Sequence, residues 1–140
     1  MTHVVGPVQS SLELAADVAQ VGVARRFVRT QLGGFVPDDV AMEVELMASE
    51  LVTNAIEHGT PGTLPISITT TRNDRQASIT VASWGRSAGV GPVTEWQIAA
   101  QGQSTGRGLG IVRAIADEIE VVQSVENLTI TARRTFPRSS

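Results

Sequence analysis

Residues 50–59 read ELVTNAIEHG, and this stretch is the strongest indication of fold and site in the chain. Within it, Glu50, Asn54 and His58 follow one another at four-residue steps and precede Gly59. On a helix such steps make a polar stripe that drifts by roughly 40° per step. An ordinary solvated helix face has the same spacing, so the stripe indicates a functional site only together with a second motif.

The helix that carries this stripe is predicted to begin at residues 37–39, Pro-Asp-Asp, and to end at Gly59. Proline fits a first helical turn, and the two acids suit the positive end of the helix dipole. Gly59 can take the left-handed stop conformation, and Pro61 prevents the helix from continuing. The opposite side of this helix is expected to be buried, and it is formed by Val44, Ala48, Leu51 and Ala55.

The second motif is TGRGLG at residues 105–110, at the start of another predicted helix. Because Gly106, Gly108 and Gly110 lack a Cβ, phosphate groups could come close to the backbone there. Free N–H groups at a helix start attract an anion, and Arg107 could add a charged contact or point to solvent. Glycines also mark turns into helices without any ligand, so this motif alone is weak.

The rest of the chain predicts strands that pair in hairpins, and helices that lie in separate parts of the sequence. A short strand at 10–14 precedes a helix that is capped by Asp17, includes Val18 on its apolar side and ends at Gly33-Gly34. The remaining predicted elements are a hairpin of residues 65–71 and 77–83, a helix at 108–117, and a hairpin of 119–123 and 128–133. This order predicts a single α+β domain over residues 1–140, a two-layer sandwich with three helices on one face of a mostly antiparallel sheet.

Composition excludes several classes of protein. The net charge of -3 gives no general attraction to nucleic acid. The absence of cysteine excludes disulfides, thiolate catalysis and sulfur-ligated zinc. No signal-like leader or membrane-length apolar segment is visible, so we expect a cytoplasmic protein that binds neither nucleic acid nor membrane directly.

All 11 basic residues are arginine, and this limits how the chain could hold phosphates. A Walker P-loop and a eukaryotic-type protein kinase each need a lysine on the phosphates, so both are excluded. Backbone amides, arginine and a metal would have to carry that role. Mg²⁺ needs only one or two protein ligands besides phosphates, so the amide oxygen of Asn54 could serve, while Glu50 one turn away could accept a proton.

Residues 50–59 resemble the N-box of the GHKL (Bergerat-fold) ATPases, and residues 106–110 are similar to their second glycine box. The phrases ELVTNAIEHG and GRGLGIV are most similar to the small bacterial anti-sigma-factor serine kinases, over nearly the whole chain. The resemblance implies the Bergerat or histidine-kinase-like ATPase fold, with Asn54 binding Mg²⁺ and Glu50 acting as base. It also implies that Gly106, Gly108 and Gly110 contact phosphates beneath a lid at 86–105.

One motif of the family departs from its pattern here. The first glycine box of these ATPases reads Asp-x-Gly, and its carboxylate holds the adenine amino group, whereas this chain has Ser83-Trp84-Gly85. Ser83 cannot supply a charged acceptor. By the two-residue period of a strand, Ser83 is predicted to face inward with Ile79 and Val81. Trp84 is expected either to pack or to shield the base pocket.

The resemblance implies a bacterial regulator that binds ATP with Mg²⁺ and transfers the γ-phosphoryl group to a serine or threonine of an antagonist protein. Its partners would be a sigma factor and that anti-anti-sigma antagonist, and homodimerisation is implied in the same way. Glu50 and Asn54 favour the kinase, whereas Ser83 favours an alternative, a non-enzymatic pseudo-ATPase that acts as a protein-binding switch. A sensor-kinase catalytic domain is less expected, because no phosphoacceptor-histidine helix pair or membrane span precedes residue 1.

Overall fold

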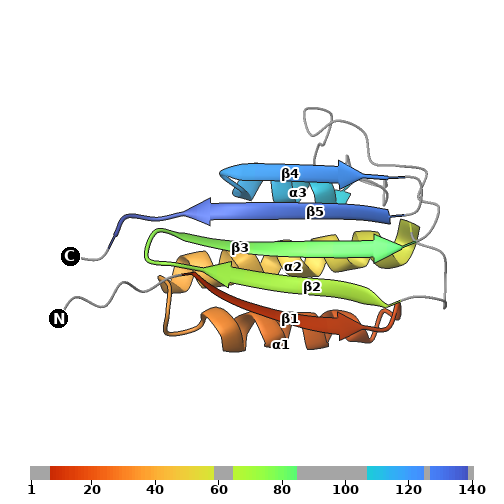
Figure 1. Cartoon of the computed structure of the whole chain (residues 1–140), viewed down its shortest axis with the longest axis horizontal. Helices are drawn as coiled ribbons and strands as arrows, with labels where there is room; N and C mark the ends of the chain where they lie inside the picture. Colours follow the sequence, from red (N-terminus) through yellow and green to blue (C-terminus); the bar gives the residue numbers. More distant parts are fainter. Residues whose placement is uncertain (1–6, 59–64, 85–106, 125–126, 139–140) are drawn as a thin grey trace.

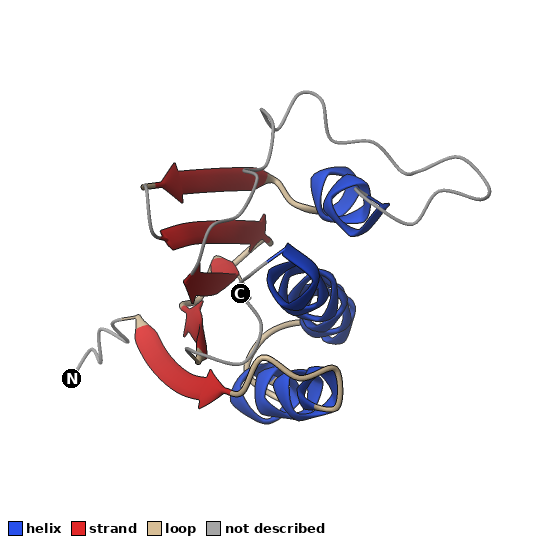
Figure 2. Cartoon of the chain, turned by 90° about the vertical axis from the view of Figure 1, so that its right-hand side faces the viewer, coloured by secondary structure: helices blue, strands red, loops and turns tan. Residues whose placement is uncertain are grey.

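The computed structural model describes residues 7–58, 65–84, 107–124 and 127–138 of the chain. The elements in order are β1 (Val8–Leu14), α1 (Gln20–Leu32), α2 (Asp38–His58), β2 (Ile66–Arg72), β3 (Gln76–Trp84), α3 (Arg107–Ile115), β4 (Glu118–Gln123) and β5 (Asn127–Thr135). The five strands form one sheet in the order β1-β2-β3-β5-β4, and every neighbouring pair is antiparallel. The helices all lie on one side of this sheet (Figure 2), which confirms the predicted α+β two-layer sandwich.

The core lies between the helices and the inner face of the sheet. α2 is the central helix, since it packs against β3 and β5 and is flanked by α1 and α3. Its predicted apolar side is buried as expected, and alternate strand residues such as Ile68, Ile79 and Ile130 are buried on the facing side of the sheet. Removal of this apolar surface from water is the main stabilising term of such a fold.

Most predicted boundaries agree with the structure to within two residues, but the start of α1 differs. Asp17 is not the N-cap, because the helix begins at Gln20 and its cap position is Ala19, without a side-chain bond. The Asp17 carboxylate instead accepts a hydrogen bond of 3.0 Å from the Ala19 N–H, which stabilises a turn before the helix. Val18 therefore lies outside the helix and is 71% exposed.

Backbone hydrogen bonds and a glycine conformation explain where α1 and α3 end. α1 ends before Gly33, whose N–H bonds to the Arg29 carbonyl oxygen, and Gly34 has a φ of 82°, so the predicted glycine stop is confirmed. α3 ends at Ile115 instead of residue 117, because the Asp117 N–H bonds to the Arg133 carbonyl oxygen and draws the chain onto β5. Gly59 and Pro61, the predicted stop of α2, lie outside the described residues.

The chain directions bring three predicted motifs to one end of the molecule. The end of α2, the end of β3 and the start of α3 all lie at the right-hand end of the sheet in Figure 1. α3 then runs back along α2, and β4 begins at the opposite end. None of the helices among the described residues has the length and apolarity needed to cross a bilayer.

Candidate functional site

The polar stripe of α2 is not a solvated helix face. Asn54 is only 7% exposed, and Glu50 is half-buried. Burying an amide or a carboxylate costs free energy unless it gains a partner, so an ordinary surface helix would turn these side chains to water. The structure therefore argues against the solvated-face interpretation at the two positions that matter chemically. The side chain of His58, the third member of the stripe, lies outside the described residues.

Glu50 meets the second motif directly. A Cβ added to Gly108 would lie 2.5 Å from Oε2 of Glu50 and 3.3 Å from its Cβ. Real Cβ atoms essentially never come so close, so only glycine at this position lets α3 approach α2 with the Glu50 carboxylate in place. The glycine that the sequence assigned to phosphate approach thus also makes room for a carboxylate.

The first turn of α3 is an electropositive helix end. It carries no acidic side chain of its own, and the N–H groups at a helix start, together with the helix dipole, favour a nearby anion. Gly110 is buried in this helix. Gly106 and the side chain of Arg107 lie outside the described residues, as does the predicted lid at 86–105. Within the described part, the first turn of α3 and Glu50 are therefore in contact.

Ser83 lies at the end of β3 on the inner face of the sheet. It is 9% exposed and shares the buried face with Ile79 and Val81, which confirms the predicted orientation. Trp84 is 43% exposed, and strand alternation directs it to the opposite face, away from the side that carries Ser83. Trp84 is thus not placed to fill a pocket beside Ser83. Gly85 lies outside the described residues.

Comparison with known proteins gives a family for this arrangement. The model of the histidine kinase-like ATPase domain matches residues 14–134. The chain belongs to this family. No curated protein matches it in sequence.

The fold of this histidine kinase-like ATPase domain is also similar to a solved structure. That structure is the crystal structure of the RsbU and RsbW domains of Rv1364c from Mycobacterium tuberculosis, with a TM-score of 0.68 and 16% sequence identity. The match covers 94% of this chain but 34% of that chain. At this identity the likeness establishes the fold alone.

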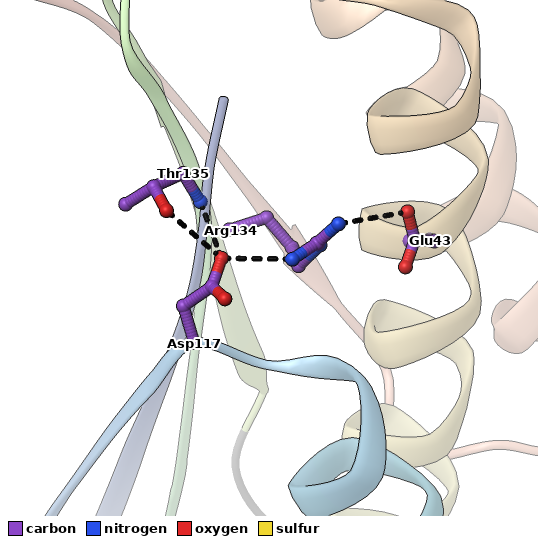
Figure 3. A network of polar contacts seen from close by, with 4 residues as sticks. All are labelled: Glu43, Asp117, Arg134 and Thr135. Atoms are coloured by element: carbon purple, nitrogen blue, oxygen red, sulfur yellow. Dashed lines mark hydrogen bonds and ion pairs between the residues drawn. The ribbon is translucent and has the colours of Figure 1, made fainter. Parts of the chain in front are cut away.

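Two ion-pair clusters fix α2 of the ATPase domain to its neighbours. Glu45, with a side chain only 11% exposed, pairs with Arg29 at 2.5 Å and with Arg25 at 3.4 Å on α1. The hydrogen bond from Arg29 lowers the pKa of Glu45, against the opposing effect of burial. The second cluster joins Glu43, Arg134, Asp117 and Thr135 (Figure 3).

Sequence reasoning missed both clusters. Glu43, Asp117 and Arg134 lie far apart along the chain, and each belongs to a different element or turn, so no local spacing pairs them. Arg25, Arg29 and Glu45 do lie on helices that were predicted, yet their pairing depends on how α1 and α2 pack. The helical spacing could have shown only that these charges lie beside the apolar side of each helix.

The side-chain oxygens of Asn54 and Glu50 are of the kind that binds Mg²⁺ when the ion is also bound by phosphate oxygens. Within the described ranges, no group of three or more His, Asp or Glu side chains is placed to hold a metal by itself. Mg²⁺ usually keeps several waters and takes one or two protein oxygens together with substrate phosphates. A buried amide oxygen from Asn54, one turn from the Glu50 carboxylate, suits that mode of binding.

Proposed function

We propose that this histidine kinase-like ATPase domain binds Mg-ATP where α2, β3 and α3 meet, and that it phosphorylates a serine or threonine of an antagonist protein. The observation that carries the proposal is the contact between Glu50 and Gly108. It sets a carboxylate beside the helix end that is best suited to hold phosphate. The burial of Asn54, one turn further along α2, also supports the proposal.

Each residue has a separate task in the proposed complex. The N–H groups at the start of α3 hold the phosphates, with Gly106, Gly108 and Gly110 giving access to the backbone and Arg107 adding a positive charge. Asn54 is the protein ligand of Mg²⁺. When bound, that ion neutralises charge on the phosphate oxygens. Ser83 and Gly85 line the position of the base.

Glu50 supports the transfer as general base. Its carboxylate accepts the proton of the attacking serine or threonine hydroxyl as that oxygen forms a bond to the γ-phosphorus. The bond from the γ-phosphorus to the bridging oxygen breaks, and ADP leaves with its electron pair. A positioned base contributes about 10²- to 10⁴-fold, and the remaining acceleration comes from positioning and electrostatics.

We further propose that the domain acts as an anti-sigma factor. The phrases ELVTNAIEHG and GRGLGIV, and the likeness of fold to a structure with an RsbW domain, support this assignment. Its partners would be a sigma factor and the antagonist that it phosphorylates, with the ATPase domain working as a homodimer in the cytoplasm.

The second candidate function is a pseudo-ATPase that switches between protein partners without catalysis, and the inward-facing Ser83 favours it. Calorimetric titration with ATP, ADP and GTP, with and without Mg²⁺, separates the two when it is followed by transfer of labelled γ-phosphate to candidate antagonists. Magnesium-dependent ATP binding with transfer supports the kinase. Sigma-factor binding without nucleotide binding or transfer supports the switch.

A further inference from the structure

Arg134 on β5 connects α2 to the turn after α3, and the other ends of these two helices meet at the proposed site. Its Nη2 atom lies 3.3 Å from Oε1 of Glu43 on α2, and its Nη1 atom lies 2.8 Å from Oδ2 of Asp117 in the turn between α3 and β4. The Arg134 side chain is 22% exposed. Figure 3 shows its guanidinium group lying between the two carboxylates.

Asp117 is itself held firmly on β5. Its Oδ2 atom accepts hydrogen bonds from the Thr135 N–H at 2.7 Å and from the Thr135 hydroxyl at 3.1 Å. Its own N–H donates to the Arg133 carbonyl oxygen at 2.8 Å. The turn that ends α3 is therefore fixed to the sheet, and Arg134 links this turn to α2.

Glu43, Arg134 and Asp117 form a charged bridge from α2 to the turn after α3, and the surroundings of Asp117 and Arg134 favour their charged forms. The backbone N–H of Thr135 is the main cause that lowers the pKa of Asp117, and Arg134 acts in the same direction. Burial by itself would lower the pKa of Arg134, but Glu43 and Asp117 outweigh burial and raise it. Charge-assisted bonds of this kind are stronger and more directional than neutral ones.

The bridge and the Glu50 contact lie at opposite ends of the α2–α3 interface. Gly108 at the start of α3 meets Glu50, whereas the turn after α3 meets Glu43 through Arg134. Glu43 and Glu50 are seven positions apart, which is about 10.5 Å along the helix. α3 thus runs antiparallel to α2 and is fixed near both of its ends. Apolar packing through the buried Leu109 and Val112 also holds α3 on the core, but the bridge adds a directional link between the turn after α3 and α2.

We infer that Arg134 is a positioning residue, whose bridge from Glu43 to Asp117 keeps the first turn of α3 in the register with α2 that holds Glu50 beside Gly108. Its catalytic consequence rests on the proposed phosphoryl transfer. The positional consequence concerns only α2 and α3, and it can be measured without nucleotide. A misplacement of about 1 Å can cost about 10²-fold in rate, so a small shift of α3 is enough to matter.

The test compares Arg134→Met, Arg134→Lys and Glu43→Gln with Arg133→Met as matched control. Arg133 is the neighbouring residue on the outer face of the sheet, where it pairs at 3.1 Å with the exposed Glu120. Both methionine variants lose one arginine and its ion pairs, but only Arg134→Met removes the link to α2. Glu43→Gln removes only the negative charge of the α2 partner, which weakens the ion pair with Arg134, and it serves as the milder variant if Arg134→Met folds poorly.

Two measurements are made on the full chain well below its melting temperature. Amide hydrogen exchange without nucleotide is expected to rise at residues 111–116, whose N–H groups are bonded along α3, in Arg134→Met and Glu43→Gln, but not in Arg133→Met. In phosphate transfer, kcat is expected to fall about tenfold or more with KM for ATP within about threefold, and Arg134→Lys should recover part of the loss. A purely structural role would lower the melting temperature and leave kcat of the folded variant unchanged.

Unchanged exchange at residues 111–116 in both Arg134→Met and Glu43→Gln, or an equal rise in Arg133→Met, overturns the inference. So does a kcat in Arg134→Met that stays within twofold of the wild type. If the wild type transfers no phosphate to any antagonist, the proposed catalytic function has failed, and the exchange measurement alone decides the role of Arg134.

Discussion

The carboxylate of Glu50 occupies the space where a side chain of residue 108 would begin, since a Cβ on Gly108 would lie 2.5 Å from its Oε2 atom. Glycine at this position therefore makes room for the proposed base, and in the proposed complex it also gives the phosphates access to the backbone. The nearest atom is the end of a flexible side chain. A methyl group at residue 108 should therefore turn the Glu50 carboxylate away without unfolding the chain.

Gly108→Ala is expected to lower kcat for phosphate transfer by about 10- to 100-fold, with ATP affinity changed only a few-fold, because it displaces the base. Gly22→Ala is the control, since its Cβ would lie 3.7 Å from the nearest atom and should stabilise α1 by up to about 1 kcal/mol. Gly108→Val, which has a larger side chain, should abolish nucleotide binding. A loss of ATP affinity in Gly108→Ala as large as its loss of kcat would show that the phosphates need this glycine more than Glu50 does.

Glu50→Asp should partly relieve the strain of Gly108→Ala, because it shortens the displaced side chain by one methylene. The double variant is then expected to be more stable than the sum of the two single changes predicts, and urea unfolding of all four proteins measures this coupling. Additive effects would mean that the two side chains do not compete for one space. Glu50→Ala should retain ATP binding and lose transfer, as expected of a base.

Asn54→Ala should weaken ATP binding in the presence of Mg²⁺ far more than in its absence, because the chain has no lysine to offset the phosphate charge. Thr53→Ala is a suitable control, since its hydroxyl donates to the Ser49 carbonyl oxygen of the same helix. Calorimetry with and without Mg²⁺ measures the difference. Equal magnesium-dependent affinity in the folded Asn54→Ala variant would contradict the assignment of Asn54 as metal ligand.

Ser83→Asp should tighten ATP binding selectively, because a buried carboxylate at the end of β3 adds a charge-assisted bond worth about 1.5–3 kcal/mol, or roughly 10- to 150-fold in affinity. The wild type should bind ATP weakly and distinguish it poorly from GTP. Ser83→Asn, similar in shape but neutral, is the control, and tryptophan fluorescence can follow the titrations. An unchanged preference for ATP over GTP in folded Ser83→Asp would favour the pseudo-ATPase alternative.

Glu45→Gln should change how stability depends on pH. The hydrogen bond from Arg29 holds the folded-state pKa of Glu45 below its unfolded value, so its stabilisation is present above the unfolded pKa and is lost as pH falls through the folded pKa. The stability difference between wild type and variant should therefore be largest near pH 7 and shrink below about pH 4. Urea unfolding across this range checks it, with the exposed Glu57→Gln as control. A difference that does not vary with pH would contradict the ion-pair assignment.

The sequence by itself determined the elements and the layer architecture. The apolar side of α2, the glycine stop after α1 and the alternating strands near Ile79 and Ile130 are local patterns, and each depends on the period of one element. The inward orientation of Ser83 followed from the same alternation and is confirmed by its burial. The start of α1 was predicted wrongly because Asp17 stabilises the turn before the helix and does not cap the helix. An aspartate just before a helix is typical of both a turn and an N-cap.

Only the tertiary structure decided which side chains of different elements meet. The contact between Glu50 and Gly108, and the bridge from Glu43 through Arg134 to Asp117, depend on the packing of α3 along α2 and β5. Periodicity along one element cannot fix the distance and register between two elements, because these are set by the volumes and charges of side chains that are far apart in the chain. The burial of Asn54 is of the same kind, since its spacing fits a solvated stripe and its surroundings are supplied by the packed fold.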